Sequence, residues 1–522
     1  MAEAFQGLKS GRGITVSEIA PMDDAIGVET ETTAAFVGRA LRGPLNTPVL
    51  LENFAEFKRR FGGIWHRSSL GPAVELFFEH GGRRLYVVRV ANNARGAMIC
   101  IPAQQGVLVL RAREPGSTEK IRAAVDYDGI ADDDREHFNL TLQRVAPESG
   151  LVADQEIYAH LTCRPRDRAF IGHALGNSEL AEPQFPLPGG RPLPTTDPAN
   201  RFGPGYVSPV QPGSDGSALT DYDLIGSADA SSGLFALNQI EYFDLLYLPP
   251  PGRQKDLGPA AILAAELYCR RRSAMLIMDP PASWDSATRA IDGVRTAGYA
   301  SSNTMTYFPR VTGRAQDGSP PRAVGGAIAG LLCKLDRRHG PWIALDQAGL
   351  HFNRTLFPAA SCTDHECAHL VREGINVIDS GTNEQAMLLG SVTLARMSQM
   401  ERNFCSLPVR RLCLAMTNAI ERATRWSVFE PNEARVAERI QAQIHAYLSS
   451  LADAGAFADD QFHVQCDAGL HTDVTDPQRG VTILLAFQPA GARHAVSLTL
   501  HQTLTGCRVA ATAFAPAMAR CA

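Results

Sequence analysis

Short apolar runs alternate with longer amphipathic stretches in two separate parts of the chain. In the first part, residues 34–38 (AAFVG) and 85–90 (LYVVRV) predict buried strands, and residues 53–63 and 70–82 predict two helices that each end at a pair of glycines. The same alternation returns near residue 232 and continues to residue 311. Strands that alternate with helices indicate a parallel or mixed sheet covered by helices.

The hydrophobic pattern changes to strict alternation between about residues 96 and 180. It is clearest at 138–143 (FNLTLQ), where every second residue is apolar, as expected for antiparallel strands with one buried face. Residues 183–216 follow with nine prolines, which favours an extended connector or an exposed loop. Two α/β parts that flank a β-rich part are most simply explained by one domain that carries an insertion.

The two ends of the chain predict different elements. Residues 13–19 (GITVSEI) form one strand-like stretch, and the loose residues 20–27 separate it from any neighbour, so this strand must pair with something elsewhere. Near the other end, Pro431 and Asn432 open a helix, and three strands are expected at 462–466, 481–487 and 494–502. The apolar residues of that helix fall on one face, and they are Val436, Ile440, Ile444, Leu448 and Leu451.

The composition is that of a globular protein and argues against several classes of function. The 522 residues are 45% hydrophobic and 20% charged, and the net charge of −5 offers no general attraction to nucleic acid or to an anionic membrane surface. No run of about 18 apolar residues occurs and the N-terminus is not basic, so we expect neither membrane insertion nor a secretory leader. The eleven cysteines include no Cys-x-x-Cys, and most are expected to be core residues.

Residues 362–370 (CTDHECAHL) contain the sharpest candidate for chemistry. On a helix, His365 and His369 could both bind zinc while Glu366 polarises a bound water. The third ligand of such a site is missing, because Arg372 and Ile375 stand where one version of the motif has its glycine and its last histidine. We interpret the two histidines as incidental and expect no metal, no cofactor and no catalysis; a zinc metallohydrolase is the alternative.

One further alternative concerns the same place, and three other features have simpler explanations. A structural metal held by Cys362 together with the two histidines is a further alternative at the same place. Asp279 ends an expected strand at a position that often carries a functional carboxylate, but the two prolines that follow favour a strand stop. Gly326-x-x-x-Gly330 lacks the rest of a nucleotide-binding loop and indicates close helix packing. The basic residues 333–340 indicate a solvated helix end.

Several long stretches, taken in order, resemble one family. The first two are TTAAFVGRALRGPLNTPVLLENFAEFKRRFGG and LGPAVELFFEHGGRRLYVVRVAN, and the most specific is LPVRRLCLAMTNAIERATRWSVFEPN at 407–432. They resemble contractile tail sheath proteins of bacteriophages and of phage-tail-like contractile injection systems. The match covers residues 14–95 and 232 to about 470, which is far more than a five-residue motif such as His-Glu-x-x-His.

The resemblance implies an α/β core, a mixed sheet flanked by helices, with an inserted β-rich domain and extended N- and C-terminal arms that donate strands. On this chain we expect an N-terminal arm at 1–25, the core at 26–95 together with 232–475, and the insertion with its connector at 96–231. The C-terminal strands and arm are expected at 476–522.

The implied function is structural. Such a subunit polymerises helically around an inner tube and contracts to drive that tube through a target envelope, here preferably in a phage-tail-like contractile injection system, with a bacteriophage tail as the alternative. The implied partners are further copies of the chain, the inner tube protein, baseplate and terminator or cap proteins, and sheath paralogues. Nucleic acid and direct membrane insertion are not expected. Assembly would occur in the bacterial cytoplasm, within a phage-tail-like particle.

The resemblance also assigns residues. The tube-facing candidates are Glu433, Arg435 and Glu438. Residues 488–500 and 507–522 depart from the family pattern, so the register of the C-terminal arm and a cap or terminator role stay open. The residues expected in strands that pair between subunits are Ile14, Val16, Ile19, Val481, Ile483, Leu485, Val496, Leu498 and Leu500.

Overall fold

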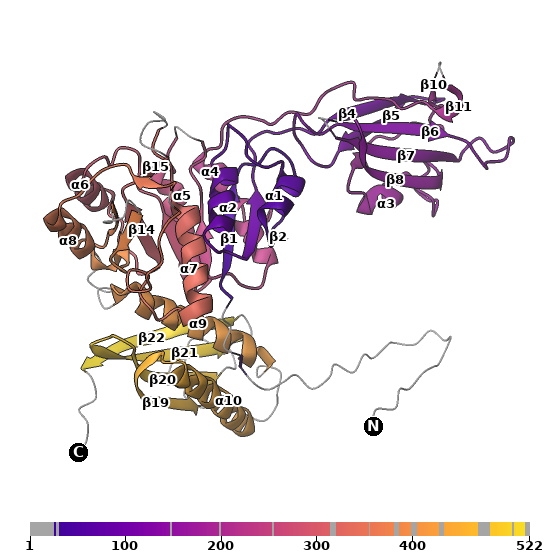
Figure 1. The fold of residues 1–522 in the computed structure, drawn as a ribbon. Helices are drawn as coiled ribbons and strands as arrows, with labels where there is room; N and C mark the ends of the chain where they lie inside the picture. The colour runs from indigo at the N-terminus through magenta and orange to yellow at the C-terminus, as the bar shows by residue number, and fades with distance from the viewer. Residues whose placement is uncertain are drawn as a thin grey trace. The chain divides into compact units, whose positions relative to one another are not determined.

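The structure is a computed structural model of the chain (Figure 1). It describes residues 26–27, 31–146, 149–197, 200–252, 255–313, 320–353, 355–380, 386–397, 404–426, 433–467, 481–503 and 506–516. The chain divides into two compact units, one that holds Glu29–Asn418 together with Pro489–His494 and one that holds Ala419–Gln488 and Ala495–Ala522. The expected N-terminal arm strand lies outside the described residues. The four-part division of the chain stays a prediction.

An eight-stranded mixed sheet forms the centre of the first unit, as the alternation of strands and helices predicted. Its strand order is β18-β17-β14-β13-β12-β1-β3-β2; β2 and β18 pair antiparallel at the two edges and the six inner strands run parallel. The strands are β1 (Thr33–Gly38), β2 (Val49–Leu51), β3 (Arg84–Arg89), β12 (Leu245–Tyr247), β13 (Met275–Met278), β14 (Thr304–Phe308), β17 (Asn376–Ser380) and β18 (Ala386–Leu389).

Helices cover both faces of this sheet, which explains why every residue of β1 is buried. Ala34 and Phe36 pack into one apolar cluster with α1, α2 and α7, whereas Ala35 and Val37 pack into a second cluster with α4 and α5. Two further helices, α6 and α8, pack against each other. The helices are α1 (Phe54–Phe61), α2 (Leu70–Glu79), α4 (Asp221–Ile225), α5 (Pro259–Arg271), α6 (Ala287–Ala297), α7 (Gly325–His339), α8 (Asp364–Arg372) and α9 (Leu407–Thr424), with 3-10 turns at Gly233–Gln239 and Leu394–Met397.

The local signals for helix ends hold in detail at α1. Asn53 accepts a hydrogen bond from the Glu56 N–H, and Gly62 ends the helix with φ 86°, a left-handed conformation that glycine adopts without a steric penalty. Basic residues fill the last turn of α7, as the sequence predicted. That helix end is not wholly solvated, however, because Cys333 and Asp336 are buried.

The glycines of the expected close helix contact lie between α7 and α2, which run side by side in Figure 1. A Cβ atom on Gly326 would stand 2.2 Å from the carbonyl oxygen of Ala73, and one on Gly330 would stand 2.4 Å from that of Phe77. Only glycine permits this approach, which confirms a packing role for Gly326-x-x-x-Gly330.

Antiparallel strands occupy the part of the chain where strict alternation predicted them. They form two three-stranded sheets, β4-β5-β9 and β6-β7-β8, around a common apolar cluster that also receives the short helix α3 (Ile171–Ala174) and the 3-10 turn Leu175–Asn177. The strands are β4 (Met98–Pro102), β5 (Val107–Ala112), β6 (Ile121–Asp126), β7 (Phe138–Val145), β8 (Val152–Leu161) and β9 (Ala181–Pro183).

The proline-rich residues 183–216 are extended, but they are not merely an exposed connector. Isolated bridges pair Pro192 with Ala103, Val207 with Ala123 and Gln211 with Met98, so this stretch runs back along the two sheets. It also contains the small hairpin of β10 (Thr196–Asp197) and β11 (Asn200–Pro204). Proline prevents helix formation, yet its carbonyl oxygens and the intervening residues can still pair with strand edges.

Two buried arginines tie this β-rich part to the large sheet. Arg89, at the end of β3, is 1% exposed and donates hydrogen bonds to four carbonyl oxygens: those of Ala40 at 3.1 Å, Leu41 at 3.3 Å, Gly43 at 2.6 Å and Pro115 at 2.7 Å. Burial lowers the pKa of Arg89 to about 10, which leaves the side chain charged at neutral pH.

The second arginine follows β1. Arg39 stacks on Trp65 at 4.6 Å and donates to the carbonyl oxygens of Asp215 and Gly216, both at 3.0 Å. Asp215 and Gly216 belong to the segment that returns from the β-rich part to the large sheet. Arg39 therefore fastens the returning segment, and Arg89 fastens the connection between β5 and β6, to which Pro115 belongs.

The second unit contains α10 and a four-stranded sheet of order β19-β20-β21-β22. Three of these strands were predicted; β22 was not, because its sequence was taken as a tail beyond the usual end of the family. The elements are α10 (Glu433–Asp453), β19 (Phe457–Asp467), β20 (Val481–Pro489), β21 (His494–Thr503) and β22 (Gly506–Pro516).

Candidate functional site

The C-terminal sheet has one apolar face and one mixed face. In β20 the burial alternates strictly, with Val481, Ile483, Leu485 and Phe487 buried and the residues between them partly exposed. The register pairs Ile483 with Leu500 and Leu485 with Leu498 on β21. This alternation is the period-two pattern that the sequence showed, so the predicted C-terminal strand residues do lie together in one sheet.

Helix α10 covers the apolar face of this sheet. Its predicted apolar positions are all buried, from Val436 at 6% exposed to Ile440, Ile444 and Leu448 at 0%. Phe462 of β19 lies 5.0 Å from the His445 ring of α10. The unit is thus an antiparallel sheet held flat against one amphipathic helix, with its other face turned away from that helix.

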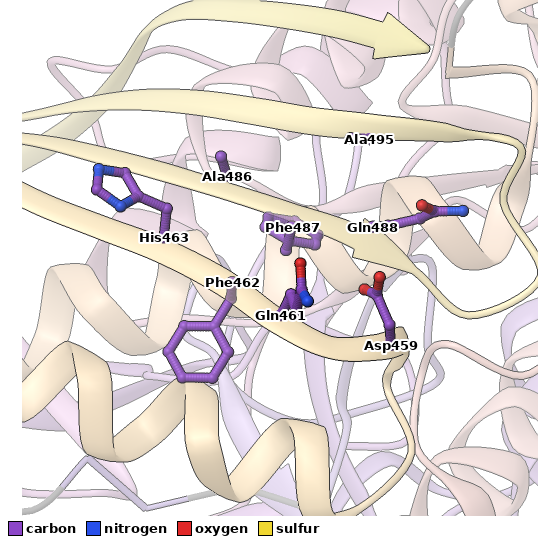
Figure 2. Close-up of a pocket in the computed structure, with 8 residues that line it drawn as sticks. All are labelled: Asp459, Gln461, Phe462, His463, Ala486, Phe487, Gln488 and Ala495. Carbon is purple, nitrogen blue, oxygen red and sulfur yellow. The ribbon is translucent and has the colours of Figure 1, made fainter. Parts of the chain in front are cut away.

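The opposite face of β19 and β20 is hollowed by a shallow pocket of about 120 Å³ (Figure 2). Asp459, Gln461 and His463 of β19 line it from one side, and Ala486 and Gln488 of β20 from the other. All three β19 side chains are exposed. Figure 2 shows Phe462 pointing away from them toward the helix.

The two outer strands of this sheet, β19 and β22, each have only one strand neighbour in the described chain. Such an edge presents unpaired backbone N–H and C=O groups, to which a strand from another chain can add. Within one chain β20 and β21 pair with each other, as antiparallel neighbours. That the strands of this unit also pair between subunits stays a prediction, and Ile14, Val16 and Ile19 lie outside the described residues.

The tube-facing candidates all belong to the start of α10. Glu438 is exposed there, opposite to the buried Ile440. Glu433 and Arg435 lie in the first turn of the same helix. The three residues are therefore brought together on one element, but their role stays a prediction.

Residues 364–372 form helix α8, as expected for the stretch with His-Glu-x-x-His. Thr363 accepts a hydrogen bond from the Glu366 N–H at 3.3 Å, and the Glu366 carboxylate accepts one from the Thr363 N–H at 2.9 Å, which together make a capping box. The hydrogen bonds that the Glu366 carboxylate accepts from the N–H and the hydroxyl of Thr363 lower the pKa of Glu366. Glu366 thus acts as a capping residue.

The two histidines of this motif do not converge with other ligands. His365 is exposed, and His369 lies 3.8 Å from Glu373, which also pairs with Arg295 at 3.0 Å. Among the residues that the structure describes, no group of three His, Cys, Asp or Glu side chains is placed to hold a metal ion. The zinc alternative therefore gains no support from the described geometry.

Asp279 holds parts of the fold together, as the prolines that follow it in the sequence suggested. Its carboxylate accepts hydrogen bonds from the N–H groups of Val324 at 3.1 Å and Gly325 at 3.0 Å, at the start of α7, and from the Tyr247 hydroxyl. Burial raises the pKa of Asp279 more than these bonds and Arg310 lower it. The residue joins the ends of β12 and β13 to a helix N-terminus.

One buried polar cluster was not foreseen. Asp336 of α7 forms an ion pair with Arg411 of α9, with the side chains 3% and 6% exposed, and also accepts a hydrogen bond from the Thr32 hydroxyl. Thr32 immediately precedes β1. No sequence signal marks this cluster, because charged residues at a helix end are usually solvated.

No family model matches the chain. A stretch of 149 residues is 31% identical to the tail sheath protein of Vibrio phage KVP40, which is 28% of this chain and 21% of the phage protein. The match thus spans about a fifth of the length of that relative.

Solved structures are similar over almost the whole chain. The crystal structure of a sheath tail protein from Listeria innocua matches with a TM-score of 0.61 at 13% identity, over 92% of this chain and 96% of that one. A sheath tail protein from Desulfitobacterium hafniense matches with a TM-score of 0.54 at 14% identity, over 96% and 100%. The chain has the fold of contractile tail sheath proteins.

The tail sheath fold is also found at a TM-score of 0.50 in the contracted sheath of an extracellular contractile injection system, PVC, at 14% identity over 94% of this chain and 96% of that one. These findings confirm the resemblance to the tail sheath family. The mixed sheet flanked by helices is a feature that this chain shares with the tail sheath fold.

None of the described helices combines the length and the apolar character that a membrane span needs.

Proposed function

We propose that this chain is a non-enzymatic structural subunit of a contractile sheath. The observation that carries the proposal is the likeness to sheath proteins over more than nine tenths of the chain. The similarity to sheaths of the anti-feeding prophage and of PVC favours a phage-tail-like contractile injection system as the setting. A bacteriophage tail is the alternative, favoured by the stretch that matches a phage tail sheath protein.

Assembly would depend on strands exchanged between copies. A strand at residues 14–19 of one copy would add to an open edge of the sheet β19-β20-β21-β22 of another copy, because main-chain hydrogen bonds give affinity without demanding a particular side-chain shape. The donor and acceptor surfaces differ, so the contact is heterologous. Heterologous contacts that do not close into a ring build an open helix, which is the form of a sheath.

Contraction would be a rigid-body change between two packings of the same subunits. The buried Arg39 and Arg89 keep the β-rich part fixed to the large sheet, so this unit would move as one body. The linker predicted from the sequence at residues 20–27 would let the exchanged strand stay paired during the movement. An extended sheath would then be a kinetically held state that a small signal at its end can release.

The partners follow from this arrangement. The start of α10, with Glu433, Arg435 and Glu438, would contact an inner tube protein. The two ends of the assembled helical sheath would contact baseplate and terminator or cap proteins. Sheath paralogues could share the lattice. Assembly would take place in the bacterial cytoplasm, and the chain would become part of a phage-tail-like particle.

Electron microscopy of the purified full chain tests the central claim. We expect tubes or short helical cylinders in the wild type and in a variant that lacks residues 1–10, which keeps the predicted strand. A variant that lacks residues 1–20 should stay monomeric with unchanged circular dichroism. Persistent monomers of the wild type under all assembly conditions, or normal tubes from the longer deletion, would contradict the proposal.

The tube contact needs a separate experiment. Co-sedimentation of assembled sheath with its inner tube protein should weaken on Glu438→Lys, because the change reverses the charge of an exposed residue of α10. Asp229→Lys changes the net charge by the same amount at an exposed position of the other unit and serves as the control. Equal binding by both variants would remove α10 from the tube contact.

A further inference from the structure

Two cysteines flank the first turn of helix α8. Cys362 precedes the N-cap residue Thr363, and Cys367 is the fourth residue of the helix. These are the two positions whose side chains meet in a hydrophobic staple, the contact that commonly accompanies a capping box. The capping box is present here, so the chain enters the helix at the angle that brings the two positions together.

The two thiols occupy that staple. Cys367 is 7% exposed and belongs to an apolar cluster with Leu370 and Val377, and Cys362 packs against the same cluster. Each of the two thiols is also among the groups that shift the pKa of the other. The Cys367 N–H donates to the Thr363 carbonyl at 2.8 Å, which fixes the backbone between them. Staples are normally made of Leu, Val or similar side chains, which cannot be oxidised in this way.

We propose that Cys362 and Cys367 are a modification site, at which hydrogen peroxide converts the staple into a disulfide across the start of helix α8. The sulfur of the more exposed Cys362 attacks a peroxide oxygen, the O–O bond breaks, and Cys362 becomes a sulfenic acid while water leaves. The sulfur of Cys367 then attacks the Cys362 sulfur. The S–S bond forms as the S–O bond breaks, and hydroxide departs with the Cys367 proton as a second water.

The environment of the pair makes this reaction slow. Burial raises the pKa of the Cys362 thiol to about 12, so little thiolate is present at neutral pH. The pair therefore stays reduced during brief exposure to oxidant and closes during prolonged exposure. Closure would fix the start of α8, which packs against α6 and β17.

Peptide mass spectrometry of the native full chain tests the site. After prolonged treatment with hydrogen peroxide, we expect a peptide that has lost two hydrogens, with Cys362 bonded to Cys367, and its recovery as two thiols on reduction. In Cys362→Ser the Cys367 thiol should stay reduced. Cys163, whose pKa is raised by burial without a charged neighbour, serves as the reference for oxidation of a partly exposed single thiol.

Three results would overturn the proposal. They are sulfinic or sulfonic acid at Cys362 with Cys367 still reduced, a bond from either residue to another cysteine of the folded chain, and an unmodified pair at a dose that oxidises Cys163. Hydrogen exchange supplies an independent measurement. The amides of the first turn of α8 should exchange about tenfold more slowly after oxidation, because the bond constrains the open state. Unchanged exchange would show that the bond does not fix the helix start.

Discussion

Replacing Gly326 by alanine probes the closest helix contact of the first unit. The added Cβ atom would lie 2.2 Å from the Ala73 carbonyl oxygen, where carbon and oxygen normally stay about 3.3 Å apart. Helix α7 must therefore move away from α2 by roughly 1 Å, a gap that forfeits up to about half of the dispersion attraction between the facing atoms. Overpacking of this kind costs about 1–3 kcal/mol.

Two terms decide the net effect of Gly326→Ala. The obstacle is backbone, which cannot rotate away as a flexible side chain would, so the upper end of the overpacking range applies, about 3 kcal/mol. Alanine is a better helix former than glycine by about 1 kcal/mol. The expected loss in the free energy of unfolding is therefore about 2 kcal/mol.

Urea unfolding followed by circular dichroism measures this loss as a lower midpoint. Gly176→Ala is the matched control, because nothing lies within 4 Å of its Cβ position, and it should change the free energy of unfolding by less than about 0.5 kcal/mol. A Gly326→Ala protein as stable as the wild type, or more stable, would show that α2 and α7 can separate without cost. The reasoning about the role of the two glycines would then be refuted.

Three further changes test other parts of the structure. Arg89→Met should lower the free energy of unfolding of the first unit by about 3 kcal/mol or more in urea unfolding, because it leaves four carbonyl oxygens without their hydrogen-bond donor. A loss under about 1 kcal/mol would contradict the claim that Arg89 holds the β-rich part to the large sheet. Burial lowers the pKa of His80 below its usual value of 6.5, helped by nearby Lys334, and its Nε2 accepts from the Asn353 N–H. The unfolded chain therefore takes up the proton first, and stability present above pH 6.5 should be lost as the pH falls below it; His80→Gln should show a smaller loss between pH 7.5 and 5.5. His365→Ala should leave sheath assembly and the metal content of the purified protein unchanged, since His365 is exposed, and one zinc per chain that disappears on this change would revive the hydrolase alternative.

The elements with strong local signals could be predicted from the sequence. Helix α1 has an N-cap at Asn53 and a glycine at its end, and α10 has five apolar residues on one face, so local preference and tertiary packing agree at both places. The strands β20 and β21 were found because each buries every second residue along a sheet with one covered face. Ordered stretches of sequence identified the family more securely than any short motif did.

The remaining features depend on contacts between distant residues. The edge strand β2 is three residues long and shows no alternation to detect, and β22 is rich in alanine, which carries a weak burial signal. From the sequence, Arg89 would be expected at the surface. In the fold, carbonyl groups from residues 40–43 and from Pro115 surround its side chain. The same holds for Asp336, whose partners lie on another helix and before the first strand. These sites could not be predicted because the residues that make their contacts lie far apart in the sequence, although the contacts themselves are strong.

The order of strands in the large sheet also constrains synthesis on the ribosome. β1 pairs on one side with β3 but on the other side with β12, and Leu245 lies 156 positions after Arg89 in the chain. At about 5–20 residues per second, the nascent chain would wait roughly 8–30 s with the inner edge of β1 unpaired. During that wait a second nascent chain on the same messenger could add to the open edge. The β-rich part that the chain makes in the interval can fold in the meantime, so its two sheets can form before the large sheet is complete.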